Sequence, residues 1–189
     1  MSKLFRMIAS ASVLACVLST AAVVSGASPA QAGVVQVWDS FEGSPWTRMD
    51  SGGDGDGVAG FDINGGVAYT GANNGWLHVG NGWAAHRLAV NLDGGFSGKK
   101  WNCSAAVRMN VLGAGAVAGL QVWDPNGWHI IAEHYPWING NGSGYHLVAI
   151  HNLDLTRFHG NIYLQVIYGD NRPTPQFIRV DDLVLQCYY

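Results

Sequence analysis

Glutamate is scarce in this 189-residue sequence, which contains only Glu42 and Glu133. Basic residues are also few, and Lys99 and Lys100 form the only adjacent pair. Beyond residue 32 the chain carries 8 basic and 13 acidic residues, a net charge of −5 with neutral histidines. A protein that binds nucleic acid needs a cationic surface against the phosphates. The composition therefore argues against a nucleic-acid partner.

Motifs of several common enzyme classes are absent as well. The sequence has no Gly-x-Ser-x-Gly elbow, no phosphate-binding loop and no Cys-x-x-Cys pair. Its seven histidines include no tight pair with the spacing of a zinc site, so we expect them at the surface or at strand edges. We therefore predict no transition-metal site.

The first 32 residues have the pattern of a cleavable signal peptide. Lys3 and Arg6 precede an apolar run over 7–24, and the small-residue triplet Ala30-Gln31-Ala32 ends the segment. No second apolar segment follows, so we expect no membrane span. An alternative is lipid attachment at Cys16, but the apolar run continues well past that residue. We predict a secreted protein with one domain over residues 33–189.

Two cysteines, Cys103 and Cys187, remain beyond the predicted cleavage site. An even number of cysteines in an exported chain favours a disulfide bond. The alternative is two separate buried thiols. A bridge would close a loop of about 85 residues, which constrains the unfolded chain strongly.

Short runs of Val, Ile, Trp and Tyr, separated by Gly, Asn, Asp and Pro, follow residue 33. No segment has the 3.6-residue periodicity of a helix. The pattern predicts an all-β fold, a two-sheet antiparallel β-sandwich (jelly roll) of about 8–10 short strands. The turn over 124–127 is the clearest hairpin connection. The acidic run over 50–57 is expected to be a solvated loop, with Ca²⁺ binding as the alternative.

Alternation within the runs predicts which side chains share a face. The expected core residues are Cys103, Ala105, Val107, Met109 and Val111; Ala118, Leu120 and Val122; Ile130 and Ala132; and Ile162, Leu164 and Val166. In the last strand the apolar parity changes from Ile178 and Val180 to Leu183, Leu185 and Cys187. An extra residue near Asp181 and Asp182 would restore one apolar face, so we predict a β-bulge there, a feature that often borders a site.

The same alternation turns Gln121 and Trp123, and likewise Tyr163 and Gln165, away from the core. Tyr135 is also expected outside. Aromatic planes beside side-chain amides suit a sugar ring, whose C–H face stacks and whose hydroxyls accept and donate hydrogen bonds. We predict that these five residues bind carbohydrate. The alternative is that they are ordinary strand aromatics beneath loops.

The order of features resembles the galactose-binding-like jelly rolls, especially the carbohydrate-binding modules appended to cellulases and xylanases. The matching segments are 38–43 with Trp46, as the opening strand; 66–71, as the second strand; and 178–185, as the closing strand with two central aspartates. In that family a structural Ca²⁺ often bridges the first and last strands. The resemblance implies Glu42 and Asp182 as ligands, assisted by Asp39 or Asp181.

We therefore expect a secreted, monomeric, non-catalytic carbohydrate-binding protein. One alternative is a small jelly-roll glycoside hydrolase, because the string Glu133-His134-Tyr135 resembles the nucleophile strand of small jelly-roll xylanases. That family's second glutamate lies late in the chain, where this sequence has none. Another alternative is a secreted interaction protein, such as an inhibitor or an envelope component.

Overall fold

The computed structural model describes residues 33–141 and 143–189, and only the backbone at 171–174. The predicted signal segment lies outside the described residues. The described part consists of ten strands and one short 3-10 helix, and none of its helices is long and apolar enough to cross a bilayer. The elements are β1 (Val34–Asp39), η1 (Pro45–Thr47), β2 (Met49–Gly55), β3 (Val58–Asp62), β4 (Asn74–Asn91), β5 (Cys103–Val111), β6 (Ala116–Asp124), β7 (His129–His134), β8 (Trp137–Ile138), β9 (His146–Leu153) and β10 (Asn161–Tyr188).

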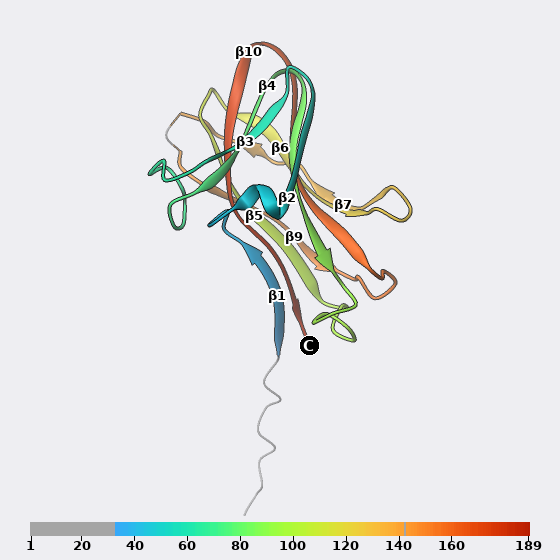
Figure 1. Ribbon diagram of the computed structural model, residues 1–189. Coiled ribbons are helices and arrows are strands. Elements are labelled where there is room, and N and C mark those ends of the chain that lie inside the picture. Colours follow the sequence, from blue (N-terminus) through green and yellow to red (C-terminus); the bar gives the residue numbers. More distant parts are fainter. Residues whose placement is uncertain (1–32, 142) are drawn as a thin grey trace, which may run out of the picture. The chain divides into compact units, whose positions relative to one another are not determined.

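Two long strands, β4 and β10, join the layers of the sandwich. The first sheet has the order β2, β4 (82–91), β10 (161–171), β6 and β7. The second sheet has the order β3, β4 (74–79), β10 (176–188), β5 and β9, and β1 pairs with the end of β10. Figure 1 shows β10 turning over at the top of the view, from its orange half to its red half. The all-β sandwich is as predicted, although these two strands are much longer than expected.

Strand alternation places the core where the sequence predicted it. Every second residue of β5 is buried, from Cys103 to Val111, and the inner residues of β6 and of the first half of β10 are fully buried. The hairpin over 124–127 joins β6 to β7 as expected. The prediction for β7 is wrong at Ile130, which is exposed, because a register shift opposite Trp123 brings Ile131 and Ala132 against the core instead.

The predicted bulge is present in β10. The pairing of β10 with β5 shifts register between Asp181 and Val184, and Asp182 has a φ of 50°. This extra residue lets Val180 and Leu183 both face the core. The predicted disulfide between Cys103 and Cys187 is also present, and it joins two directly paired residues of β5 and β10.

Three local expectations are wrong. Residues 66–71, expected to be a strand, form a loop. The acidic run that begins at Asp50 is not a loop but lies mostly in β2, because it pairs along β4. His86 is fully buried rather than at the surface, stacked on Phe61 with ring centroids 4.8 Å apart. Long-range pairing with β4 overrides the local turn signals in the second case.

The two ends of the described domain lie side by side. β1 runs antiparallel to the last residues of β10, from Val34 opposite Tyr188 to Asp39 opposite Leu183. Gly33 and Tyr189 exchange backbone hydrogen bonds of 2.7 and 3.0 Å. Figure 1 shows β1 in blue beside the dark red end of β10.

Candidate functional site

A row of polar side chains crosses the outer face of the first sheet. One residue from each of its five strands takes part, because the five are directly opposite one another in register: Asp50, Arg87, Gln165, Gln121 and Glu133. Neighbouring strands lie about 4.8 Å apart, so long side chains at paired positions can touch from one strand to the next. We call the face that carries this row, together with Trp123, Tyr163, Trp128 and Tyr135, the Trp123 face.

One ion pair and three hydrogen bonds connect the five residues of the row. Arg87 forms an ion pair of 3.5 Å with Asp50, and its Nε donates to Gln165 Oε1. Gln165 Nε2 donates to Gln121 Oε1 at 2.5 Å, and Gln121 Nε2 donates to Glu133 Oε2 at 3.0 Å. Guanidinium only donates and carboxylate only accepts, so the charged ends fix the orientation of both amides. The three hydrogen bonds all run in the direction from Arg87 to Glu133, which strengthens each of them.

Beside the row lies a hollow of about 200 Å³. Its aromatic lining is Trp123, Tyr163 and Trp128, and its polar lining includes Arg87 and Gln165. Trp123 and Tyr163 are paired across β6 and β10. The Trp123 Nε1 donates to Gln121 Oε1 at 2.7 Å, which fixes the plane of the indole ring. Trp128 is 81% exposed at the tip of the hairpin between β6 and β7. The hollow thus combines flat apolar surfaces with oriented polar groups.

The structure brings three of the five predicted binding residues to this hollow, namely Trp123, Tyr163 and Gln165. Gln121 is only 5% exposed and does not line the hollow, so it positions Trp123 and Gln165 from below. Tyr135 lies on the other side of the row, where a Cβ added at Gly119 would come within 2.0 Å of its ring.

Tyr135 closes the far side of the polar row. Burial, and after it the negative charge of Glu133, raise the pKa of the Tyr135 hydroxyl above its usual value, while a hydrogen bond with Gln121 opposes the shift. The hydroxyl therefore keeps its proton at neutral pH. Tyr135 offers a second aromatic surface, separated from Trp123 by the amides of the row.

Arg87, Asp50 and Trp128 were missed by the reasoning from sequence. Arg87 stands at an outward position of β4, between Ala85 and Ala89, where alternation alone would have placed it on this face. Asp50 was assigned to a loop. Trp128 follows the predicted turn directly, so its place at the hairpin tip was available from the sequence.

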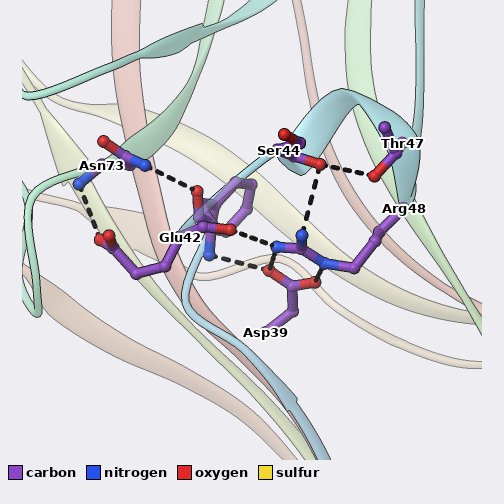
Figure 2. A network of polar contacts seen from close by, with 7 residues as sticks. Asp39, Glu42, Ser44, Thr47, Arg48 and Asn73 are labelled. Carbon is purple, nitrogen blue, oxygen red and sulfur yellow. Dashed lines mark hydrogen bonds and ion pairs between the residues drawn. The ribbon is translucent and has the colours of Figure 1, made fainter.

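The four acids expected to bind Ca²⁺ each accept hydrogen bonds from donors within the protein. The guanidinium of Arg48 donates two hydrogen bonds to Asp39, from Nε to Oδ2 at 2.6 Å and from Nη2 to Oδ1 at 2.9 Å. Figure 2 shows this pair. Glu42 Oε1 accepts the backbone N–H groups of Ala72 at 2.7 Å and Asn73 at 2.8 Å. Figure 2 shows Glu42 beside Asn73. These contacts tie the segment after β1 to the loop before β4.

The two aspartates of the bulge also have donors. Asp181 Oδ2 accepts the backbone N–H groups of Tyr69 and Thr70 at 2.8 and 3.0 Å. Asp182 Oδ1 accepts from Trp38 Nε1 at 3.0 Å and from the Thr70 hydroxyl at 2.7 Å. Among the described residues no three His, Cys, Asp or Glu side chains gather around a common point. Binding of Ca²⁺ by these acids stays a prediction.

Comparison with known proteins gives a fold but no sequence relative. No family model matches the sequence, and no curated protein matches it. Solved structures do match. A carbohydrate-binding module named TmCBM61, in complex with β-1,4-galactotriose, has a TM-score of 0.54 and 16% sequence identity, covering 77% of this chain and 92% of the module.

Two modules from Clostridium thermocellum are similar to the same degree. A family 11 carbohydrate-binding module, in complex with a β-1,3-1,4-mixed-linked tetrasaccharide, has a TM-score of 0.54 and 15% identity over 82% of this chain and 96% of the module. The C-terminal family 22 module of Xyn10B has a TM-score of 0.54 and 13% identity, covering 79% and 90%. The chain therefore has the β-sandwich fold that these modules share.

Proposed function

Because the chain has the β-sandwich fold of carbohydrate-binding modules, we propose that it binds a polysaccharide or cell-surface glycan on the Trp123 face. The observation that carries the proposal is the hollow in which Trp123 and Tyr163 stand beside the guanidinium of Arg87, which the buried amide of Gln165 orients. Aromatic rings stack on the C–H face of a sugar, and the polar groups meet its hydroxyls.

The arrangement suits a neutral sugar. The guanidinium of Arg87 already has the Asp50 carboxylate as a partner, and the amide of Gln165 is held on both sides. A ligand that enters the hollow therefore meets preorganised dipoles rather than an unpaired charge, which lowers the cost of ordering the site. Two of the similar modules were solved with neutral β-linked oligosaccharides.

The proposal is for binding without catalysis. A glycoside hydrolase needs two carboxyl groups about 5–9.5 Å apart on one cleft. The two carboxylates of the polar row, Asp50 and Glu133, are four strand spacings apart, which is about 19 Å. Glu133 is moreover hydrogen bonded to Gln121 at 3.0 Å, and Glu42 is engaged by two backbone amides. This spacing favours binding over hydrolysis.

The proposal includes export from the cytoplasm. Disulfides persist in oxidising compartments, and Cys103 and Cys187 are bonded in the structure. The signal-peptide pattern over residues 1–32 supports the same conclusion.

Affinity electrophoresis in gels that contain β-1,4-galactan, mixed-linked β-glucan or xylan tests the proposed site. We expect retardation by at least one of these neutral polymers, and about a tenfold or greater loss of affinity for Trp123→Ala, because a stacking residue at the centre of a site carries much of the binding energy. Trp101→Ala is the matched control, since Trp101 is exposed outside the face. Unchanged retardation of Trp123→Ala would contradict the site.

A further inference from the structure

The outer face of the second sheet carries its own hollow, of about 280 Å³. Its lining comes from four strands, with Gln36 and Trp38 from β1, Asp182 and Val184 from β10, Ala106 and Arg108 from β5, and Leu147 from β9. We call this the Trp38 face. Trp38 and Leu147 are each 56% exposed; Val184 and Ala106 are in register with Trp38, and Leu147 is opposite Arg108. The short side chains leave the flank of the indole ring open.

The β-bulge of β10 holds the aromatic residues of this face in place. Asp182 accepts a hydrogen bond from Trp38 Nε1, so the indole ring is fixed although more than half of its surface is exposed. Asp181 accepts the backbone N–H groups of Tyr69 and Thr70, which holds Tyr69 beside Arg108. An exposed tryptophan that is already ordered loses little side-chain entropy when a ligand stacks on it.

Arg108 is a positively charged residue of this face. Its guanidinium carbon lies 4.5 Å from the centroid of the Tyr69 ring, a cation–π contact that sets its plane. Within residues 33–141 and 143–189 its guanidinium makes no hydrogen bond or ion pair. Its backbone partner Asp181 directs its carboxylate to the loop amides. Asp182 lines the same hollow, but its Oδ1 receives two donors and it does not pair with Arg108.

We propose that the Trp38 face is a second glycan-binding site, specific for a sugar ring that carries a carboxylate, such as a uronate unit of a polysaccharide. Trp38 stacks on the C–H face of the ring, and Arg108 takes the carboxylate through two parallel N–H groups, the geometry that guanidinium offers to carboxylates. Gln36 is placed for a hydroxyl. The inference shares the ligand class of the proposed function but uses none of its residues.

The test uses the full chain and two acidic polymers, polygalacturonate and alginate, in EDTA so that Ca²⁺ does not gel them. Fully methyl-esterified polygalacturonate is the matched neutral probe, because it keeps the backbone and lacks the charge. We expect at least one acidic polymer to bind, and about a tenfold or greater loss of affinity for Trp38→Ala and for Arg108→Gln. Raising NaCl from about 0.05 to 0.5 M should weaken the binding several-fold.

Two controls keep this result separate from the Trp123 face. Trp123→Ala should bind the acidic polymer as the parent does, and Lys99→Gln removes a distant positive charge and should have no effect. Each variant is checked for an unchanged melting temperature. If an acidic polymer binds and no neutral polymer does, the proposed function is wrong and this inference stands. If neutral polymers bind through Trp123 but no acidic polymer binds, the reverse holds.

Three results overturn the inference. The first is equal affinity for the acidic and the esterified polymer. The second is loss of acidic binding in Trp123→Ala but not in Trp38→Ala. The third is a dimer, seen by analytical ultracentrifugation, that Trp38→Ala dissociates while no acidic polymer binds; the face would then be an interface between two copies.

Discussion

The two outer faces of the sandwich use the same residue types for different chemistry. Each presents a tryptophan, an arginine and a glutamine over a hollow of 200–280 Å³. On the Trp123 face Arg87 is paired with Asp50 and Gln165. On the Trp38 face, among the described side chains, the guanidinium of Arg108 contacts only the ring of Tyr69. The residue types alone do not distinguish the two faces. The faces differ in whether the arginine has a polar partner within its own sheet.

Register explains the difference. In the first sheet five strands are aligned without interruption at the rank of Arg87, so each polar side chain meets the next. In the second sheet the bulge interrupts the pairing of β10 with β5 between Asp181 and Val184. The carboxylate opposite Arg108 is thereby turned to the loop that contains Tyr69. The inserted residue of the bulge thus leaves Arg108 without the carboxylate partner that Arg87 has in the first sheet.

The largest expected effect comes from breaking the disulfide, which belongs to the second sheet alone. The double variant Cys103→Ser, Cys187→Ser should lose typically 2–4 kcal/mol, with about 4–5 kcal/mol as the entropic upper value for a loop of this length. Guanidinium unfolding without reductant measures the loss. Hydrogen exchange should then show weaker protection in β5 and the end of β10 than in β6. Equal loss of protection in both sheets would show that the bridge does not distinguish them.

A smaller effect on the free energy of unfolding comes from His86, which is buried between the two sheets and should affect both of them equally. Burial lowers the pKa of His86 to about 4, although hydrogen bonding of its Nε2 with the carbonyls of Trp76 and Gly60 opposes the shift. The unfolded chain takes up this proton at about pH 6.5 and the folded chain does not. Stability is therefore lost as the pH falls from about 6.5 to about 4, by roughly 3 kcal/mol for such a shift.

Thermal melts of the parent and of His86→Gln across this pH range measure the effect as a difference in slope. The comparison of slopes is needed because burial also raises the pKa of Asp181 to about 6, which gives a contribution of opposite sign between about pH 6 and pH 4. Parallel curves for the two proteins would show that His86 does not titrate in this window.

The smallest expected effect separates the two arginines directly. Arg87→Met leaves the Oε1 atom of Gln165, a residue only 2% exposed, without its donor, which costs about 1–3 kcal/mol. Arg108→Met removes no hydrogen bond and should change the free energy of unfolding by about 0.5 kcal/mol or less. Urea unfolding of both variants gives the comparison. Equal losses would mean that the row across the first sheet does not contribute to stability.

Alternation along each strand is a local property, so the sequence was sufficient for the core and for the outward placement of Trp123 and Tyr163. It was also sufficient for the bulge, because Val180 and Leu183 can face the same interior only if the strand between them gains a residue. The disulfide followed from the even number of cysteines in a chain predicted to be exported. These features depend on the chain near each residue, or on a single pairing.

The polar row could not be foreseen, because it depends on the register of five strands at once. Gln121 was expected to contact ligand, yet neighbours that are 12 and 44 residues away, Glu133 and Gln165, occupy its amide. The expectation of a loop at Asp50 failed for the same reason, since its glycine-rich run is ordered by pairing with β4. The acids expected to bind metal found donors in Arg48 and in loop amides, which no spacing in the sequence reveals.

The adjacent ends of the domain determine how it would respond to tension. Gly33 and Tyr189 stand at the same end of an antiparallel ladder, so a pulling force applied through them opens the β1–β10 bonds one at a time, as a zipper opens. The covalent link from Cys187 to Cys103 anchors the end of β10, so β1 is the strand that peels away. Since β1 carries Trp38, mechanical load would dismantle one face of the sandwich and leave the other intact.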